Sequence, residues 1–159
     1  MSKNQKVQRL LKESYLAMIK NSAGTKMFRN FYVKIGGKKE DSTRGGELSC
    51  AYFVSSVLIA FDLIKKIHLS VNGLLEEMEK CGWKKIKNPR KGSVLVWESK
   101  KFDDEQHRHI GFFISNTKAI SNNFKKKTPT IHHWTFKRKR KVETILWHQK
   151  LEEEIAKIN

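Results

Sequence analysis

The chain has 159 residues and a formal net charge of +17 at pH 7, from 33 Lys and Arg against 16 Asp and Glu. This length predicts a single domain, residues 1–159, around one core. A hydrophobic content of 38% and only two prolines exclude a disordered or linker-like chain. The charge predicts affinity for polyanions such as nucleic acid, anionic lipid or other anionic polymers, and it indicates no particular fold.

The chain has two cysteines, Cys50 and Cys81, which could form at most one disulfide. Residues 1–20 are charged and amphipathic and lack the apolar stretch and cleavage site of a signal peptide. No apolar run reaches the roughly 18 residues of a membrane span. We therefore expect a cytoplasmic protein with reduced thiols, or one exported by a non-standard route or released by lysis.

The N-terminal quarter is basic and predicts helix followed by loop. Apolar residues at helical spacing predict a helix over Gln5–Lys20, within a basic helical N-terminal extension over residues 1–40. The aromatic residues that follow predict a short helical or extended segment that ends at Gly36-Gly37. A polar loop over Lys38–Glu47 comes next.

A second helix is predicted to begin at Cys50, with Ser49 as its N-cap. Its apolar residues fall at steps of three and four and form one buried stripe, which comprises Cys50, Phe53, Val54, Val57, Leu58, Phe61 and Ile64. A third helix is predicted over Val71–Cys81 and ends at Gly82.

The second half of the chain predicts an antiparallel sheet. After a turn at Pro89–Gly92 and with a polar loop at Asp103–Arg108, the predicted strands are Ser93–Trp97, His109–Ile114, Lys118–Asn122, Thr130–Phe136 and, more weakly, Val142–Trp147. The second and third of these form a hairpin, and the tail from Gln149 is predicted to be helical. Helices followed by an antiparallel sheet indicate an α+β fold.

Cys50 and His109 carry the predicted chemistry. A thiol becomes a nucleophile when a base takes its proton, and the start of a helix favours the thiolate. His109, at the start of a strand, is the expected base, and the two would form a thiolate–imidazolium pair able to attack a carbonyl carbon. The backbone N–H of Cys50 is the expected first donor to the oxyanion, and the sequence does not identify the second.

Three segments resemble the NlpC-type and CHAP-type cell-wall hydrolases of the papain-like superfamily. Cys50–Leu58 resembles their nucleophile helix, Asn88–Trp97 their Pro-x-x-Gly-Asp strand entry, and His109–Ile114 their His-Val-Gly-Ile-Tyr strand. The resemblance makes residues 45–136 the catalytic core and 142–159 a C-terminal segment. It implies a papain-like fold, with the nucleophile helix packed on an antiparallel sheet, and a cysteine peptidase or amidase that cuts an amide bond in peptidoglycan, within the stem peptide or between peptide and sugar.

A third residue must hold the imidazole in the correct tautomer. The family's spacing from His109 points to Ser121, where relatives often have His. Asn122 fits the chemistry better, because its amide oxygen accepts a hydrogen bond from an imidazole N–H, and we prefer it. Gly111 leaves room beside His109 for either side chain. This chemistry needs no metal or organic cofactor.

Other interpretations remain. The basic stretches Lys125–Lys127 and Lys137–Lys141 are compatible with a nucleic-acid or anionic-polymer binding module, although no nucleic-acid-binding signature accompanies them. In a hydrolase the same stretches would serve attachment and take no part in the chemistry. An inactive papain-like relative is a further alternative. A metal site built from His107, His109 and His132-His133 has unconvincing ligand spacing, and we expect Cys81 to be structural.

Overall fold

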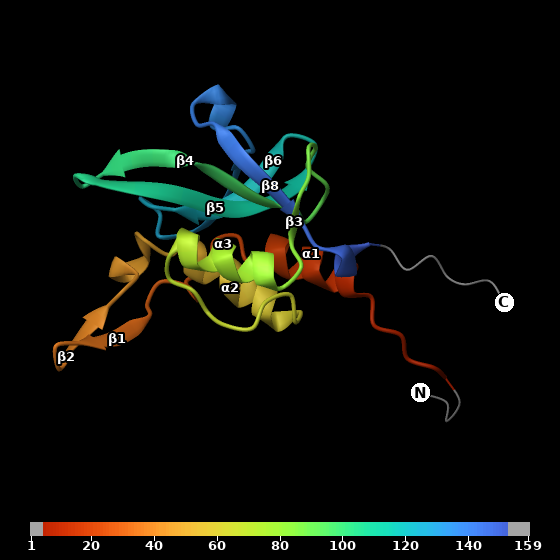
Figure 1. Cartoon of the computed structure of the whole chain (residues 1–159), viewed down its shortest axis with the longest axis horizontal. Coiled ribbons are helices and arrows are strands. Elements are labelled where there is room, and N and C mark those ends of the chain that lie inside the picture. Colours follow the sequence, from red (N-terminus) through yellow and green to blue (C-terminus); the bar gives the residue numbers. More distant parts are fainter. Residues whose placement is uncertain (1–4, 153–159) are drawn as a thin grey trace.

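A computed structural model describes residues 5–152, which form three α-helices and two antiparallel sheets (Figure 1). The helices are α1 (Leu11–Asn21), α2 (Cys50–Ala60) and α3 (Val71–Lys80). The strands are β1 (Tyr32–Ile35), β2 (Lys38–Asp41), β3 (Lys84–Lys85), β4 (Val94–Phe102), β5 (Glu105–Ser115), β6 (Lys118–Asn123), β7 (Thr128–His133) and β8 (Val142–Trp147). Short 3-10 turns are η1 (Arg44–Gly46), η2 (Phe136–Arg138) and η3 (Gln149–Leu151). No helix among residues 5–152 is long and apolar enough to cross a membrane.

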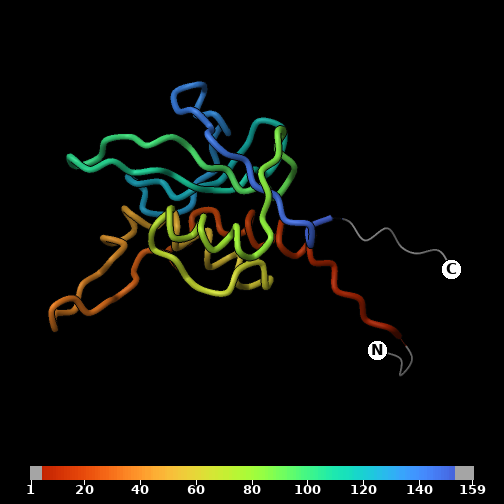
Figure 2. The backbone as a smooth tube through the Cα atoms, viewed as in Figure 1, coloured from red at the N-terminus to blue at the C-terminus, as the bar shows by residue number. Residues whose placement is uncertain are grey.

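The main sheet has the strand order β3-β8-β4-β5-β6-β7, and the helices cover one of its faces (Figure 1). Strands β1 and β2 form a separate hairpin. In Figure 2 this hairpin and the long β4–β5 hairpin extend toward the same end of the molecule. The predicted α+β arrangement of helices on an antiparallel sheet is confirmed.

The core lies between the helices and the sheet because alternate strand residues face the helices. The Phe112 ring of β5 contacts Tyr15 of α1 and Phe53 of α2 edge to face, with centroids 5.9 and 5.5 Å apart. Burial of each such side chain stabilises the fold by roughly 1.5–3 kcal/mol. On the opposite face, Leu95, Trp97, Phe113 and Ala119 form a second, smaller apolar cluster.

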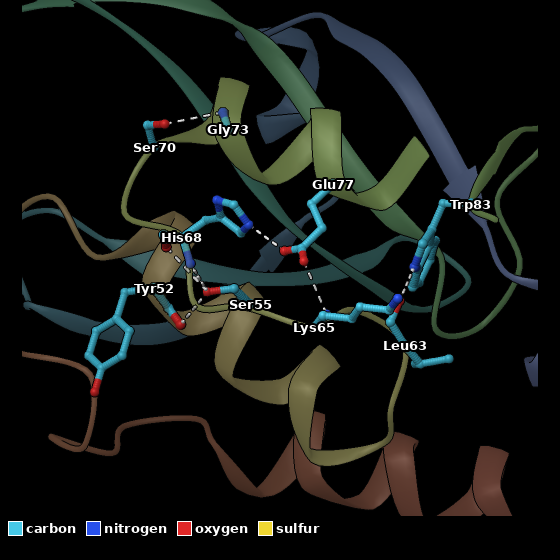
Figure 3. A network of polar contacts seen from close by, with 9 residues as sticks. All are labelled: Tyr52, Ser55, Leu63, Lys65, His68, Ser70, Gly73, Glu77 and Trp83. Carbon is cyan, nitrogen blue, oxygen red and sulfur yellow. Dashed lines mark hydrogen bonds and ion pairs between the residues drawn. The ribbon is translucent and has the colours of Figure 1, made fainter. Parts of the chain in front are cut away.

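The loop between α2 and α3 is held by polar contacts (Figure 3). The Ser55 hydroxyl lies 3.1 Å from the backbone nitrogen of His68 and 3.2 Å from its carbonyl oxygen. The His68 ring pairs with Glu77 of α3, and the Trp83 indole donates to the Leu63 carbonyl at 2.9 Å. These contacts fix α2, and therefore its first residue, relative to α3.

Two predicted boundaries near the N-terminus are wrong. Helix α1 begins at Leu11 and not at Gln5, because Val7 and Leu10 are 74% and 55% exposed and have no apolar surface to cover. The segment predicted as a polar loop from Lys38 contains β2, which pairs with β1 from Tyr32↔Asp41 to Ile35↔Lys38. Gly36 and Gly37 form the turn of that hairpin, both with positive φ, as glycine allows.

Two predictions in the second half also need correction. The polar loop predicted at Asp103–Arg108 is reduced to the turn residues Asp103 and Asp104, because β5 begins at Glu105 and pairs with Phe102. The helix predicted from Gln149 is a single 3-10 turn up to Leu151, and residues 153–159 lie outside the described part of the chain. The weakly predicted strand Val142–Trp147 is confirmed as β8 and lies between β3 and β4.

Candidate active site

A cavity of about 730 Å³ opens where α2 begins. Cys50 and His109 both line it, so the structure brings the two predicted reactive residues to one cavity. The remaining walls come from the segment before α2, the start of α3, the outer part of the β4–β5 hairpin, the end of β6, Phe136 and Arg140.

The segment that leads into Cys50 is held by the carboxylate of Asp41. It accepts hydrogen bonds from the backbone N–H groups of Phe31, Thr43 and Gly45 and from the side chains of Thr43 and Asn30, at 2.7–3.2 Å. Burial alone would raise the pKa of this carboxyl, but the hydrogen bonds outweigh burial and hold the pKa well below its ordinary range. Asp41 therefore anchors the turn at Gly45-Gly46, which ends four residues before Cys50.

Cys50 is the first residue of α2, as predicted, and Ser49 occupies the N-cap position. Among residues 5–152 the Ser49 side chain makes no capping hydrogen bond, and its buried hydroxyl finds no partner there. Burial raises the pKa of the Cys50 thiol. The backbone N–H groups of Ile110 and Ala51 and the positive charge of Arg140 act in the opposite direction without outweighing burial. The resting group is therefore the thiol, and the thiolate expected from the helix start alone does not form in this state.

His109 lies on β5 with its ring against Trp97, at a centroid distance of 5.3 Å. Its Nε2 atom is 2.8 Å from the hydroxyl oxygen of Ser121. Burial, followed by the positive charge of Arg140 and the neighbouring His132, lowers the pKa of His109 to about 3. The imidazole is therefore neutral at pH 7 and available as a base.

A chain of hydrogen bonds fixes which nitrogen of His109 carries the proton. The His132 Nδ1 atom lies 2.8 Å from the carbonyl oxygen of His133, which only accepts, so Nδ1 carries the proton of that ring. The neutral His132 Nε2 then accepts from the Ser121 hydroxyl at 2.7 Å. With its proton directed to His132, the Ser121 oxygen accepts from Nε2–H of His109. Nδ1 of His109 is left as the basic nitrogen.

The side chain against His109 is Ser121 and not Asn122, the residue preferred on chemical grounds. Strands β5 and β6 pair Gly111 with Ser121, so Ser121 shares a face with His109, and the next residue points to the other face. Asn122 donates to the Gly46 carbonyl at 2.8 Å, and its own buried amide oxygen has no partner in the described part of the chain. The room expected at Gly111 is confirmed, because a Cβ there would lie 2.7 Å from the Ser121 Cβ and 3.1 Å from the Trp97 ring.

Arg140 is a site residue that sequence reasoning missed. Its Nε and Nη2 atoms donate to the carbonyls of Glu98 and His107, each at 2.9 Å, and its side chain lines the cavity. Nothing distinguishes it in the sequence from its basic neighbours in Lys137–Lys141. His132 was missed as well, because only the strand register shows that it lies beside Ser121.

A family model described as a bacteriophage peptidoglycan hydrolase matches residues 44–154. The chain belongs to this family. A comparison with curated proteins found no match. The prediction of a cell-wall hydrolase is confirmed at this level, and the α+β structure is consistent with a papain-like hydrolase fold. The matched range includes Cys50, His109, Ser121, His132 and Arg140.

Two further observations bear on the chemistry of this peptidoglycan hydrolase. Both cysteines are free, and no hydrogen bond joins the Cys50 thiol to the His109 ring within residues 5–152. In the same part of the chain, no group of three or more His, Cys, Asp or Glu side chains is placed to hold a metal ion. The sulfur lies against the backbone N–H of Ile110, the residue after His109.

Proposed function

We propose that this peptidoglycan hydrolase cleaves an amide bond by a thiol mechanism, with Cys50 as nucleophile and His109 as base. The observation that carries the proposal is the hydrogen-bond chain from His109 through Ser121 to His132, beside a cavity that Cys50 also lines. These hydrogen bonds leave His109 as a neutral imidazole whose Nδ1 can accept the proton of a thiol at a helix start.

In the first half-reaction, the proton of the Cys50 thiol passes to Nδ1 of His109 while the sulfur attacks the amide carbon. The carbonyl oxygen takes the electron pair, and the first N–H groups of α2, which lack partners within the helix, stabilise that oxyanion. Collapse of the intermediate breaks the C–N bond, and the proton on Nδ1 goes to the leaving amine. A thioester between Cys50 and the acyl half of the substrate remains.

In the second half-reaction, His109 takes a proton from water, and the resulting hydroxide attacks the thioester carbon. The C–S bond breaks, the Cys50 sulfur regains a proton, and the acyl half leaves as a carboxylic acid. Ser121 and His132 are positioning residues in this scheme, because their hydrogen bonds hold the His109 ring and its tautomer through each half-reaction. Since both partners are neutral at rest, proton transfer accompanies the attack and does not precede it.

The test is hydrolysis of purified peptidoglycan by variants at the two cysteines. Cys50→Ala should abolish release of soluble fragments, whereas Cys81→Ala, which removes the other thiol, should retain activity. The lost sulfur costs about 1–2 kcal/mol of stability, and circular dichroism establishes whether the variant is folded. Substantial hydrolysis by folded Cys50→Ala would exclude the thiol mechanism.

Attachment to anionic polymer is a second role that we propose for the basic surface. Lys125 and Lys126 after β6 and Lys137 and Arg138 in η2 are exposed, and Lys125 also lines the cavity. These exposed positive charges beside the site would hold the enzyme on an anionic wall polymer or nucleic acid. The affinity would fall as the salt concentration rises. Cosedimentation with such a polymer over a salt series measures this affinity.

A further inference from the structure

Arg140 is held over the cavity by an irregularity in the sheet. The pairing of β4 with β5 shifts register between Trp97 and Lys100, and this β-bulge lies next to the His109 position. At the bulge, the carbonyls of Glu98 and His107 accept from Arg140. One bond goes to each strand, so the guanidinium is fixed across β4 and β5 beside the reactive residues.

The remaining donors of Arg140 have no acceptor in the described chain. A guanidinium carries five N–H groups, and the two hydrogen bonds to Glu98 and His107 use two of them. Within residues 5–152 no carboxylate forms an ion pair with Arg140. The other arginine of the cavity, Arg108, differs, because it donates to Asn72 and pairs with Glu143.

The charge around the cavity has one dominant sign. Its basic residues are Lys100, Lys101, Arg108, Lys125 and Arg140, and Glu47 is the one acidic residue in its lining among the described residues. Arg140 is the cation whose charge acts on both Cys50 and His109. A planar cation with free N–H groups, fixed by backbone acceptors, is the group that binds carboxylates best in proteins.

We propose that Arg140 binds a carboxylate of the substrate next to the scissile amide, so that the enzyme selects peptides that carry a free carboxyl group there over those in which it is amidated. The proposal rests on the proposed function, since it places the substrate at the Cys50 cavity. It names the substrate class, an anionic peptide.

Alkylation of Cys50 tests this selection without any turnover. Iodoacetate and iodoacetamide transfer similar groups with the same leaving iodide, and they differ in the carboxylate that Arg140 would bind. The full chain is treated with each reagent, and the rates at Cys50 and Cys81 are measured by mass spectrometry, with Cys81 as the internal reference. Because His109 is neutral at pH 7, a preference for iodoacetate at Cys50 is not due to an imidazolium.

The expected iodoacetate-to-iodoacetamide rate ratio is higher at Cys50 than at Cys81. Arg140→Gln should lower the Cys50 ratio by roughly tenfold, the effect of one charge-assisted hydrogen-bonded contact. Arg140→Lys should keep part of the preference. Lys139→Gln, which removes an exposed charge next to Arg140, should change the ratio by less than about twofold.

Two outcomes would overturn the proposal. An unchanged ratio in Arg140→Gln means that Arg140 does not meet the carboxylate. An equal slowing of both reagents means that Arg140 acts only on the thiolate. If Arg140→Gln does not fold, protection of Cys50 in the wild-type protein is measured instead. N-acetylglutamate should slow iodoacetamide labelling of Cys50, and its diamide should not. Equal protection by the two compounds contradicts the proposal.

Wall fragments that differ only in amidation of the carboxyl complete the test. The wild type should cleave the free-acid form with the higher kcat/KM, and Arg140→Gln should reduce that ratio. Equal cleavage of both forms would refute the selection while leaving the thiol mechanism standing, whereas failure of the wild type to cleave either form, with the alkylation preference intact, would count against the mechanism alone.

Discussion

At the residue scale, the site depends on which face of β6 meets β5. Ser121 and Asn122 are neighbours in sequence, yet one contacts His109 and the other contacts the Gly46 carbonyl on the opposite side of the strand. The two residues therefore have separate roles. Ser121 belongs to the chain that fixes the tautomer of His109, and Asn122 ties the end of β6 to the turn before Cys50.

Ser121→Ala should lower kcat by a factor of roughly ten to a thousand with little change in KM, because it removes the acceptor that holds His109 Nε2–H. Ser121→Thr, which keeps the hydroxyl, should restore much of the rate. Asn122→Ala should act mainly on stability, by about 1–3 kcal/mol, since it leaves the Gly46 carbonyl without its donor. A large loss of kcat in a stable Asn122→Ala variant, with Ser121→Ala near wild type, would contradict this assignment.

At the scale of elements, the sequence pattern predicts the helices and strands that carry the site well. The apolar stripe from Cys50 is α2, and the hairpin around Asn116 is β5–β6. The secondary-structure predictions that fail concern segments shaped by contacts that are remote in sequence. Glu105 and its neighbours are polar and exposed, and they form a strand only because β4 lies alongside.

The candidate site could be predicted only in part, because some of its residues are placed by contacts that are remote in sequence. Cys50 stands at the start of α2, where sequence patterns are informative. His109 is predicted at the start of its strand but lies inside β5, directly before the apolar run that makes the strand recognisable. The contacts of Ser121 depend on register, and those of His132 on the strand next to it. Arg140 is held at the cavity because a bulge exposes two carbonyls, and the residues from Trp97 to Lys100 include no glycine that would signal a bulge.

The segment that precedes α2 depends on Asp41 for its conformation. Asp41→Asn should destabilise the protein by about 1–3 kcal/mol at pH 7, because an amide has one acceptor oxygen and cannot satisfy the donors that the carboxylate satisfies. Since the folded pKa of Asp41 is depressed, its contribution is present above the ordinary pKa near 3.8 and is lost as pH falls below it.

Urea unfolding at pH 7 and pH 3 measures this contribution, with Asp103→Asn in the exposed β4–β5 turn as the matched control. The difference in the free energy of unfolding between the wild type and Asp41→Asn should be smaller at pH 3 than at pH 7. A difference of the same size at both pH values would show that the carboxylate charge is not the stabilising feature.

At the scale of the whole molecule, elements from both ends of the described chain share one core. Tyr15 of α1 and Leu151 of η3 belong to the same buried cluster as Phe53 and Phe112. We therefore propose that α1 and the segment from β8 to η3 fold with residues 45–136 as a single domain, so that global stability and the state of the site are coupled.

The buried, neutral ring of His109 predicts that the fold is less stable in acid. The pKa of His109 is about 3 in the folded protein, against an ordinary value of 6.5, so the unfolded chain binds more protons between these two values. The free energy of unfolding should therefore fall as pH falls from 6.5 towards 3, and His132, whose pKa burial also lowers, acts in the same direction. His109→Gln should make this pH dependence shallower, as measured by urea unfolding at several pH values. An identical slope in the variant would mean that His109 is not buried as a neutral ring.

The thiol mechanism requires a thioester at Cys50, which mass spectrometry of the intact enzyme, quenched in acid during turnover of soluble peptidoglycan fragments, would detect. We expect a mass increase equal to the acyl half of the substrate, located on Cys50, absent from Cys50→Ala and lost after treatment with hydroxylamine. Fragment cleavage that proceeds with no adduct on Cys50, or with the adduct on another residue, would contradict this mechanism.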